Sequence, residues 1–309
     1  MASDLWHLIA IFLSIMCLIW SYKFVSRRNQ PALDTTPGAA ATLVVSGADN
    51  FADWVSLNLF VPAAASKVKQ SYDAFLILDV EATCQRGFDF DYPNEIIEFP
   101  VCLMRWKDRD GDKASQLEVI EEFRSFVKPS WRPSLSEFCT ELTGITQDQV
   151  DAAPEFPAVL RSFRGFLVKH RLIEKNGKRR LRFCWCSDGP FDIRDFVVKQ
   201  CFISKMPIPD WMTGDVLDVR SLVKTHTSKI IRPIPRVGTL NIPAQLSVLG
   251  LSPFQGRQHS GIDDTRNIAR IMTQLALEGV RLQPNTAINP RRRWYWMGKS
   301  QIIEENLAH

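Results

Sequence analysis

Residues 75–78 are all apolar and are followed by the acidic residues Asp79 and Glu81. This segment limits the folds that the chain can adopt more than any other segment does. A continuous apolar run of this kind predicts a central strand that is covered on both faces. Because side chains alternate along a strand, Asp79 and Glu81 are expected on one side and Val80 on the other. Two carboxylates beside an apolar strand are costly unless a cation compensates them, and hard divalent cations prefer oxygen ligands. The pair indicates either a metal site or a solvated strand end.

Residues 69–285 have the pattern of an α/β domain, with a mixed sheet flanked by helices. Further strands are predicted at residues 95–106, 117–129 and 180–187. Helical stretches are predicted within residues 142–170, with a break around Pro154 and Pro157, and at residues 188–203. The last of these helices is expected to have Asp188 as its N-cap and Pro190 in its first turn.

Composition sets broad limits on the class of protein. The chain has 309 residues, of which 45% are hydrophobic and 23% charged, which allows one domain of about 200–250 residues and an extra segment. The net charge of +4 argues neither for nor against a nucleic-acid partner. Seven cysteines without a C-x-x-C pair suggest neither a zinc site nor a disulfide framework, so no disulfide-linked partner is expected.

The N-terminus contains an apolar run at residues 5–22, with aromatic residues near both ends and basic residues after it. Residues 1–28 are therefore predicted to be a transmembrane anchor with a basic flank, which places the rest of the chain in the cytosol, on the endoplasmic reticulum or the mitochondrial outer membrane. A signal or transit peptide and a buried helix are the alternatives. The alternative is that the protein is soluble and located in the cytoplasm or the nucleus, or that it is located in the mitochondrial matrix. Residues 29–68, rich in Ala, Pro, Ser and Thr, are predicted to be a tether.

Further candidate residues lie later in the chain. Asp192 is in the first turns of a predicted helix, and taken alone it is better explained as an acid favoured by the helix dipole. His259 and Asp264 are five residues apart, which predicts the histidine in a loop and Asp264 on the helix that follows. Asp263 competes with Asp264 and could instead cap that helix. Two other acids, Asp195 on a helix face and Glu98 inside a strand, are predicted to be structural.

These segments together resemble the DEDDh-type 3′–5′ exonucleases, and among them the Eri-type exoribonucleases. The resemblance rests on ILDVEATC, EIIEFPV, FCTELTGITQDQVD, DGPFDI and HSGIDDTRNIARI and covers roughly residues 71–280. It implies an RNase H-like fold with a five-stranded mixed sheet, and a 3′–5′ exonuclease domain at residues 69–285. It also implies two Mg²⁺ ions, with Mn²⁺ as a substitute, and release of 5′-mononucleotides from the 3′ end of RNA.

The resemblance assigns a role to each candidate residue. It implies that four carboxylates hold the metal ions and that His259 is the general base; the four are Asp79, Glu81, Asp192 and Asp264. The terminal nucleotide is expected to border Ala82, Thr83, Cys84, Leu142 and Thr143. The implied partner is a single-stranded RNA 3′ end, alone or beside a stem, and protein partners are not indicated. A DNA exonuclease of the same superfamily and a catalytically weak RNA-binding protein are the alternatives.

Two basic segments are open to more than one interpretation. Residues 169–182 contain seven Lys or Arg around an Asn-Gly turn and form either a phosphate-contacting hairpin or a solvated turn. The predicted tail, residues 286–309, contains arginines and aromatics at 291–299. These aromatics could stack on bases, or the tail could pack back onto the domain.

Overall fold

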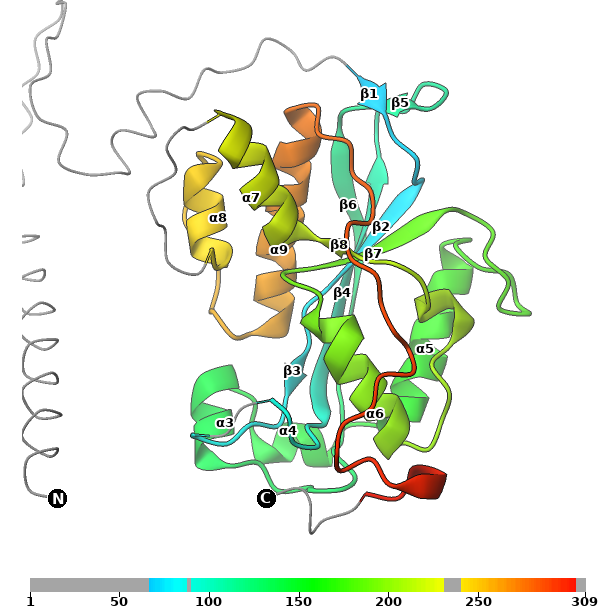
Figure 1. Cartoon of the computed structure of the whole chain (residues 1–309), viewed down its shortest axis with the longest axis vertical. Helices are drawn as coiled ribbons and strands as arrows, with labels where there is room; N and C mark the ends of the chain where they lie inside the picture. Colours follow the sequence, from blue (N-terminus) through cyan, green and yellow to red (C-terminus); the bar gives the residue numbers. More distant parts are fainter. Residues whose placement is uncertain (1–66, 88–89, 231–239, 304–309) are drawn as a thin grey trace, which may run out of the picture. The chain divides into compact units, whose positions relative to one another are not determined.

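Six strands form the main sheet in the computed structural model, which describes residues 67–87, 90–230 and 240–303 (Figure 1). Strands β2 and β4 are antiparallel, whereas β2, β7 and β8 run parallel to one another. The sheet is therefore mixed, as predicted. Its strands are β2 (Ala74–Leu78), β3 (Glu81–Ala82), β4 (Ile96–Trp106), β6 (Leu117–Phe126), β7 (Phe183–Ser187) and β8 (Leu217–Asp218). A separate two-stranded sheet joins β1 (Val68–Lys69) to β5 (Lys113–Ala114).

The sixth strand corrects the expected number of five. Both β2 and β3 pair with β4, and the pairing of Leu78 with Val101 continues in the same register as the pairing of Glu81 with Glu98. The strand is interrupted at residues 79–80, where the backbone N–H of Val80 donates to the Asp192 carboxylate instead of to a neighbouring strand. The interruption thus occurs at the candidate site. It makes two strands, β2 and β3, out of what would otherwise be one strand beside β4.

Helices cover both faces of the sheet (Figure 1). One face, with Phe75 and Ile77 of β2, packs against α7 (Val219–Ile230), α8 (Ile242–Val248) and α9 (Gly261–Leu277). The other face, with Leu76, Leu78 and Val80, packs against α5 (Phe156–Lys169) and the helix that follows β7. Alternation along β2 therefore places Asp79 and Glu81 on the α9 side. The sequence predicts that these two residues share one side.

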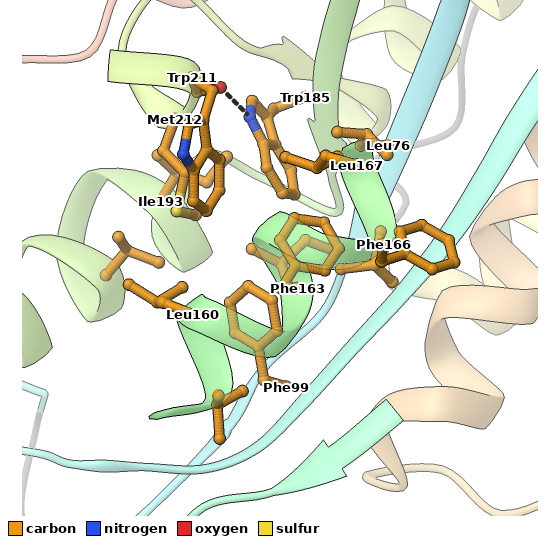
Figure 2. Close-up of a cluster of buried hydrophobic side chains, with 14 of the residues drawn as sticks. Leu76, Phe99, Leu160, Phe163, Phe166, Leu167, Trp185, Ile193, Trp211 and Met212 are labelled. Atoms are coloured by element: carbon orange, nitrogen blue, oxygen red, sulfur yellow. Dashed lines mark hydrogen bonds between the residues drawn. The ribbon is translucent and has the colours of Figure 1, made fainter. Parts of the chain in front are cut away.

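Aromatic side chains fill the core on the α5 side (Figure 2). Phe163 of α5 lies 5.4 Å from Phe99 and 5.7 Å from Trp185, measured between ring centroids. The indole N–H of Trp185 donates to the carbonyl of Trp211 at 3.0 Å, so its polar atom is satisfied inside the core. This core fixes β7 against α5 and so fixes the segment after β7.

The helix after β7 begins later than predicted. It starts as a π-helix, η1 (Asp192–Val197), and continues as α6 (Val198–Ile203), with Phe191 at the N-cap position. Asp188 is not its cap, because its carboxylate pairs with Arg220 at 2.6 Å. The π-helical turn carries Asp192, and such turns occur often at functional sites.

Shorter elements complete the domain. Helices α3 (Glu137–Thr143) and α4 (Gln147–Asp151) follow β6, and their caps are Ser136 and Thr146. The 3₁₀ turns are η2 (Asp210–Met212) and η3 (Lys299–Gln301). The basic segment at residues 169–182 forms a turn that precedes β7 and therefore lies at the end of this strand away from Asp188. No helix in the described residues is long and apolar enough to cross a membrane, and the predicted anchor at residues 1–28 lies outside them.

Candidate active site

The predicted acidic residues meet at one edge of the sheet. Strands β2 and β7 are parallel, so their carboxyl ends lie together, and a cavity of about 510 Å³ opens there. Its walls combine segments that are far apart in the sequence. They include all five residues predicted to be catalytic, which are Asp79, Glu81, Asp192, His259 and Asp264.

Asp79 and Glu81 enter the cavity from the interruption between β2 and β3. Burial raises the pKa of Asp79 well above its usual value, and the charges of Asp192 and Asp264 raise it further. Burial likewise raises the pKa of Glu81, with the charges of Asp264 and Glu98 adding to the effect. Buried carboxylates that raise one another's pKa favour protons or cations in their midst.

Asp192 connects the segment after β7 to the segment after β2 by a hydrogen bond. It is buried in the first turn of η1, and its Oδ1 accepts the backbone N–H of Val80 at 2.8 Å. Burial raises the pKa of Asp192 to about 7, although the hydrogen bond from Val80 opposes this shift. The bond crosses 112 positions of sequence and fixes this carboxylate beside Asp79.

The two adjacent acids of α9 have different surroundings. Asp263 accepts the backbone N–H of Arg257 at 3.1 Å and pairs with Arg266, so it organises the preceding loop. Asp264 lines the cavity, and its buried Oδ2 has no hydrogen-bond partner. Burial raises the pKa of Asp264 to about 7. Of the two, Asp264 is the acid that is available to a ligand.

His259 lies in the loop before α9, as its spacing from Asp264 predicts. Its backbone has φ of 60°, a left-handed conformation that is uncommon for residues other than glycine and occurs often at functional sites. Partial burial and the positive charge of Arg257 lower the pKa of His259 below its usual value. The ring is therefore neutral near pH 7 and can accept a proton.

Two acids that were predicted to be structural or solvated lie in the cavity wall. Asp188 accepts from Arg220 and from the side-chain amide of Gln245 at 2.6 Å. Asp195, predicted on a solvated helix face, pairs with Arg194 and Arg292. Both carboxylates are paired with arginine side chains, whereas Asp264 Oδ2 has no hydrogen-bond partner.

Four of the five predicted nucleotide-bordering residues line the cavity, namely Ala82, Cys84, Leu142 and Thr143. Thr83 does not belong to the lining. Its hydroxyl accepts the backbone N–H of Glu95 at 2.9 Å and its carbonyl accepts from Asn94 at 2.8 Å, so it fixes the segment before β4. The cavity also includes residues that the sequence did not single out, which are Phe90, Phe191, Phe196, Arg220, Asn241 and Gln258. Phe191 directly precedes Asp192 in the DGPFDI segment. No local pattern identifies the other five, because they are assembled by tertiary contacts.

The carboxylates fit divalent cations by their chemistry. In the described ranges no three or more His, Cys, Asp or Glu side chains are arranged, as they stand, to hold an ion. Four acidic side chains nevertheless line one cavity, of which Asp192 and Asp264 are buried and Asp79 and Glu81 half-buried. The buried Oδ2 of Asp264 lacks the partner that a buried oxygen needs. Oxygen-only donors of this kind suit Mg²⁺ or Mn²⁺ better than softer metals. Binding would require the carboxylates to turn toward a common ion.

Comparisons with known proteins show the family to which the chain belongs. A family model described as Exonuclease matches residues 76–272. The 3′–5′ exonuclease eri1 of Schizosaccharomyces pombe is 39% identical over 237 residues, which cover 72% of this chain and 71% of that protein. The 3′–5′ exoribonuclease 1 of Rattus norvegicus is 34% identical over 225 residues, 73% of this chain and 59% of that protein. The chain thus spans less than two thirds of the rat relative.

Solved structures of exonucleases are also similar to this chain. The nuclease domain of 3′hExo, a DEDDh family member bound to rAMP, has a TM-score of 0.61 and 32% identity. The match covers 72% of this chain and 100% of that domain. A 3′-exonuclease described in 3′-end specific recognition of histone mRNA stem-loop has the same TM-score and identity, and the match covers 72% and 69% of the two chains. The fold is the RNase H-like exonuclease fold. The chain belongs to the exonuclease family, with the Eri-type 3′–5′ exonucleases as its relatives, and is a hydrolase.

Proposed function

We propose that the protein is a metal-dependent exoribonuclease that shortens RNA from the 3′ end and releases 5′-mononucleotides. One observation carries the proposal. Carboxylates from three separate segments, represented by Asp79, Asp192 and Asp264, line a single cavity, and one buried oxygen among them has no partner. Such a site needs positive charge, and a nuclease supplies it as bound cations.

RNA is the proposed substrate because several relatives, among them the rat protein, are named as exoribonucleases. The solved neighbours include one bound to rAMP and one described with an mRNA stem-loop. A single-stranded 3′ end, beside a stem or not, is the substrate form that follows. A DNA exonuclease of the same superfamily is the second candidate, since contacts that distinguish ribose from deoxyribose can come from backbone groups.

In the proposed mechanism five residues have a role. Asp79, Glu81, Asp192 and Asp264 would hold the cations. Two Mg²⁺ ions, or Mn²⁺ in their place, supply the activation of water and the neutralisation of charge at the scissile phosphate. A ring nitrogen of His259 accepts the proton of the attacking water, because its lowered pKa keeps the ring neutral near pH 7. The hydrogen bond from Val80 keeps Asp192 oriented toward Asp79.

We also propose that residues 1–28 anchor the protein with its catalytic domain in the cytosol, at the endoplasmic reticulum or the mitochondrial outer membrane. The support is the apolar run at residues 5–22 with basic residues after it.

The test of the nuclease proposal uses the purified full chain with 5′-labelled single-stranded RNA, stem-loop RNA and single-stranded DNA. Each is incubated with Mg²⁺, Mn²⁺ or EDTA, beside an Asp79→Asn variant that keeps the shape of the side chain. We expect a metal-dependent ladder that shortens from the 3′ end of RNA and is absent from the variant. Faster shortening of DNA would support the second candidate. Binding of RNA without any shortening would support an RNA-binding protein and overturn the nuclease proposal.

A further inference from the structure

Phe90 is an exposed aromatic side chain in the wall of the candidate active site. It lines the cavity together with Phe196 and is 56% exposed. The two rings meet edge to face with their centroids 5.5 Å apart. Phe196 belongs to η1, the helix that also carries Asp192. A phenyl ring in this place offers a stacking surface to a nucleobase, because every base has a π face.

A buried lysine holds the backbone beside Phe90. Lys199 of α6 has no exposed surface, and its ammonium donates to the carbonyl of Phe90, to the carbonyl of Tyr92 at 3.3 Å and to Asn94 Oδ1 at 2.9 Å. Burying an ammonium is costly unless its hydrogen bonds are made, and here they are made to one short segment. Hydrogen bonds from Lys199 of α6 therefore help to fix the conformation of residues 90–94.

The C-terminal tail packs onto the same segment. The ring of Trp294 lies 4.9 Å from the Lys199 ammonium, and the buried indole of Trp296 donates to the carbonyl of Asp91 at 2.7 Å. Trp296 also packs edge to face on Phe202 of α6, with ring centroids 5.7 Å apart. Trp294 and Trp296 therefore pack back onto the domain, whereas Tyr295 between them is exposed. Trp296 contacts the segment that presents Phe90.

Arg292 connects the tail to the cavity wall a second time. Its guanidinium pairs at 2.5 Å with Asp195 of η1, one residue before Phe196. The tail thus contacts both sides of the aromatic pair, with Trp296 beneath the segment of Phe90 and Arg292 on the helix of Phe196. Each ring therefore has a tail contact at the preceding or following residue, at Asp91 for Phe90 and at Asp195 for Phe196.

We infer that Phe90 is a base-stacking residue for the RNA strand that enters the site, and that Trp294 and Trp296 are positioning residues that hold it there. The inference rests on the proposed function, because it takes the strand to be RNA that is cut in this cavity. It gives the tail a part in substrate binding without any contact between tail and RNA. A stack of one base on one aromatic ring contributes enough for its loss to weaken binding about tenfold.

The first experiment pairs a protein change with a substrate change. Wild-type and Phe90→Ala full-length protein are given single-stranded RNA in which one base at a time, among the four nearest the 3′ end, is replaced by an abasic ribose. At the base that stacks on Phe90, we expect the abasic change to raise KM about tenfold for the wild type and to leave KM of Phe90→Ala unchanged. Phe90→Trp should restore the wild-type pattern. Equal sensitivity of wild type and Phe90→Ala at all four positions would overturn the stacking role.

The second experiment tests the tail. Trp296→Phe keeps an aromatic ring in the buried site but removes the N–H donor to Asp91. We expect a severalfold rise in KM with kcat within about twofold of the wild type, and a weaker response to the abasic change. Tyr295→Ala is the control, because Tyr295 lies between the two tryptophans but is 54% exposed. Wild-type KM and abasic response in Trp296→Phe would overturn the positioning role.

Failure of the inference and failure of the proposed function are distinguishable. If wild-type protein shortens none of the RNAs with Mg²⁺ or Mn²⁺, the proposed function fails and the inference fails with it. If wild-type protein shortens RNA but Phe90→Ala shows wild-type kinetics on every substrate, only the inference fails. Thermal unfolding of each variant shows whether a rise in KM comes with loss of the fold, and an arginine variant, Arg292→Gln, gives an independent test of the tail should Trp296→Phe be unfolded.

Discussion

Glu98 Oε2 accepts the backbone N–H of Gly261 at 3.1 Å, so a residue inside β4 holds the first residue of α9. The other oxygen of Glu98 accepts from Arg124 at 2.7 Å, which compensates a carboxylate that is 1% exposed. Glu98 is also the cross-strand partner of Glu81. The contact therefore ties the start of α9, which carries Asp264, to the strand pair that carries Glu81. The predicted structural role of Glu98 includes the orientation of the candidate site.

Replacement of Gly261 should disrupt this contact. A Cβ on Gly261 would lie 2.6 Å from the carbonyl oxygen of Asp79 and 2.9 Å from Pro100, closer than real Cβ atoms approach. We expect Gly261→Ala to lower the free energy of unfolding by about 1–3 kcal/mol and to reduce kcat, because α9 must shift away from Asp79. Chemical denaturation and the RNA ladder assay measure the two effects.

Gly165 provides the matched control for that prediction. It lies within α5, and a Cβ there would meet no heavy atom within 4 Å. Gly165→Ala should raise the free energy of unfolding by up to about 1 kcal/mol and leave kcat unchanged. A Gly261→Ala variant as stable and as active as Gly165→Ala would contradict the close approach of α9 to Asp79.

The stability of the metal-free protein should depend on pH. Asp192 and Asp264 have pKa values of about 7 in the folded protein, whereas an ordinary aspartate has 3.8. The folded state therefore binds protons more tightly than the unfolded state, and this stabilisation is present at low pH and is lost as the pH rises toward 7. Each group contributes at most about 1.4 kcal/mol per pH unit in that window.

Thermal unfolding in EDTA at pH 5.5, 6.5 and 8 measures the effect. We expect Tm to fall as the pH rises, and Mg²⁺ to raise Tm more at pH 8 than at pH 5.5, because a cation binds the ionised carboxylates. Asp264→Asn, a neutral side chain of similar shape, should show a smaller dependence. A Tm in EDTA that is constant from pH 5.5 to 8 would contradict the raised pKa values.

His259 should titrate below pH 6.5, and Arg257 should be part of the cause. Partial burial lowers the pKa of His259 first and the charge of Arg257 adds to the effect. We expect Arg257→Gln to raise the pKa of His259, as measured from its ring-proton resonances in an NMR titration. His259→Ala should reduce kcat by about 10²–10⁴-fold, with KM for RNA changed much less. An unchanged pKa in Arg257→Gln would show that the arginine does not act on the ring.

The predicted anchor can be tested apart from the nuclease domain. Residues 1–30 fused to a fluorescent protein should remain with membranes after carbonate extraction, because the apolar run at residues 5–22 would span the bilayer. A matched fusion with Leu13 and Ile15 changed to Asp should be extracted. Release of the unchanged fusion by carbonate would rule out the anchor.

The sequence by itself determined the elements that follow from local pattern. The apolar run at residues 75–78 is a buried strand, and the two-residue spacing puts Asp79 and Glu81 on the same side of the sheet. The spacing of His259 and Asp264 gives a loop residue followed by a helix residue. These predictions succeed because alternation along a strand and rotation along a helix depend only on neighbouring residues.

Tertiary structure alone decided which side chains meet. Asp188 has the sequence context of a helix cap, but it faces Arg220, which lies 32 positions away. Asp195 has the context of a solvated helix face, but the C-terminal tail brings Arg292 to it. Val80 donates to Asp192 instead of extending β2, and this divides the expected strand in two. Phe90 carries no signal in the sequence, because its place at the cavity depends on Lys199 and Trp296, more than 100 positions away. Such contacts follow from how the sheet and helices pack, and packing depends on the whole chain rather than on any local pattern.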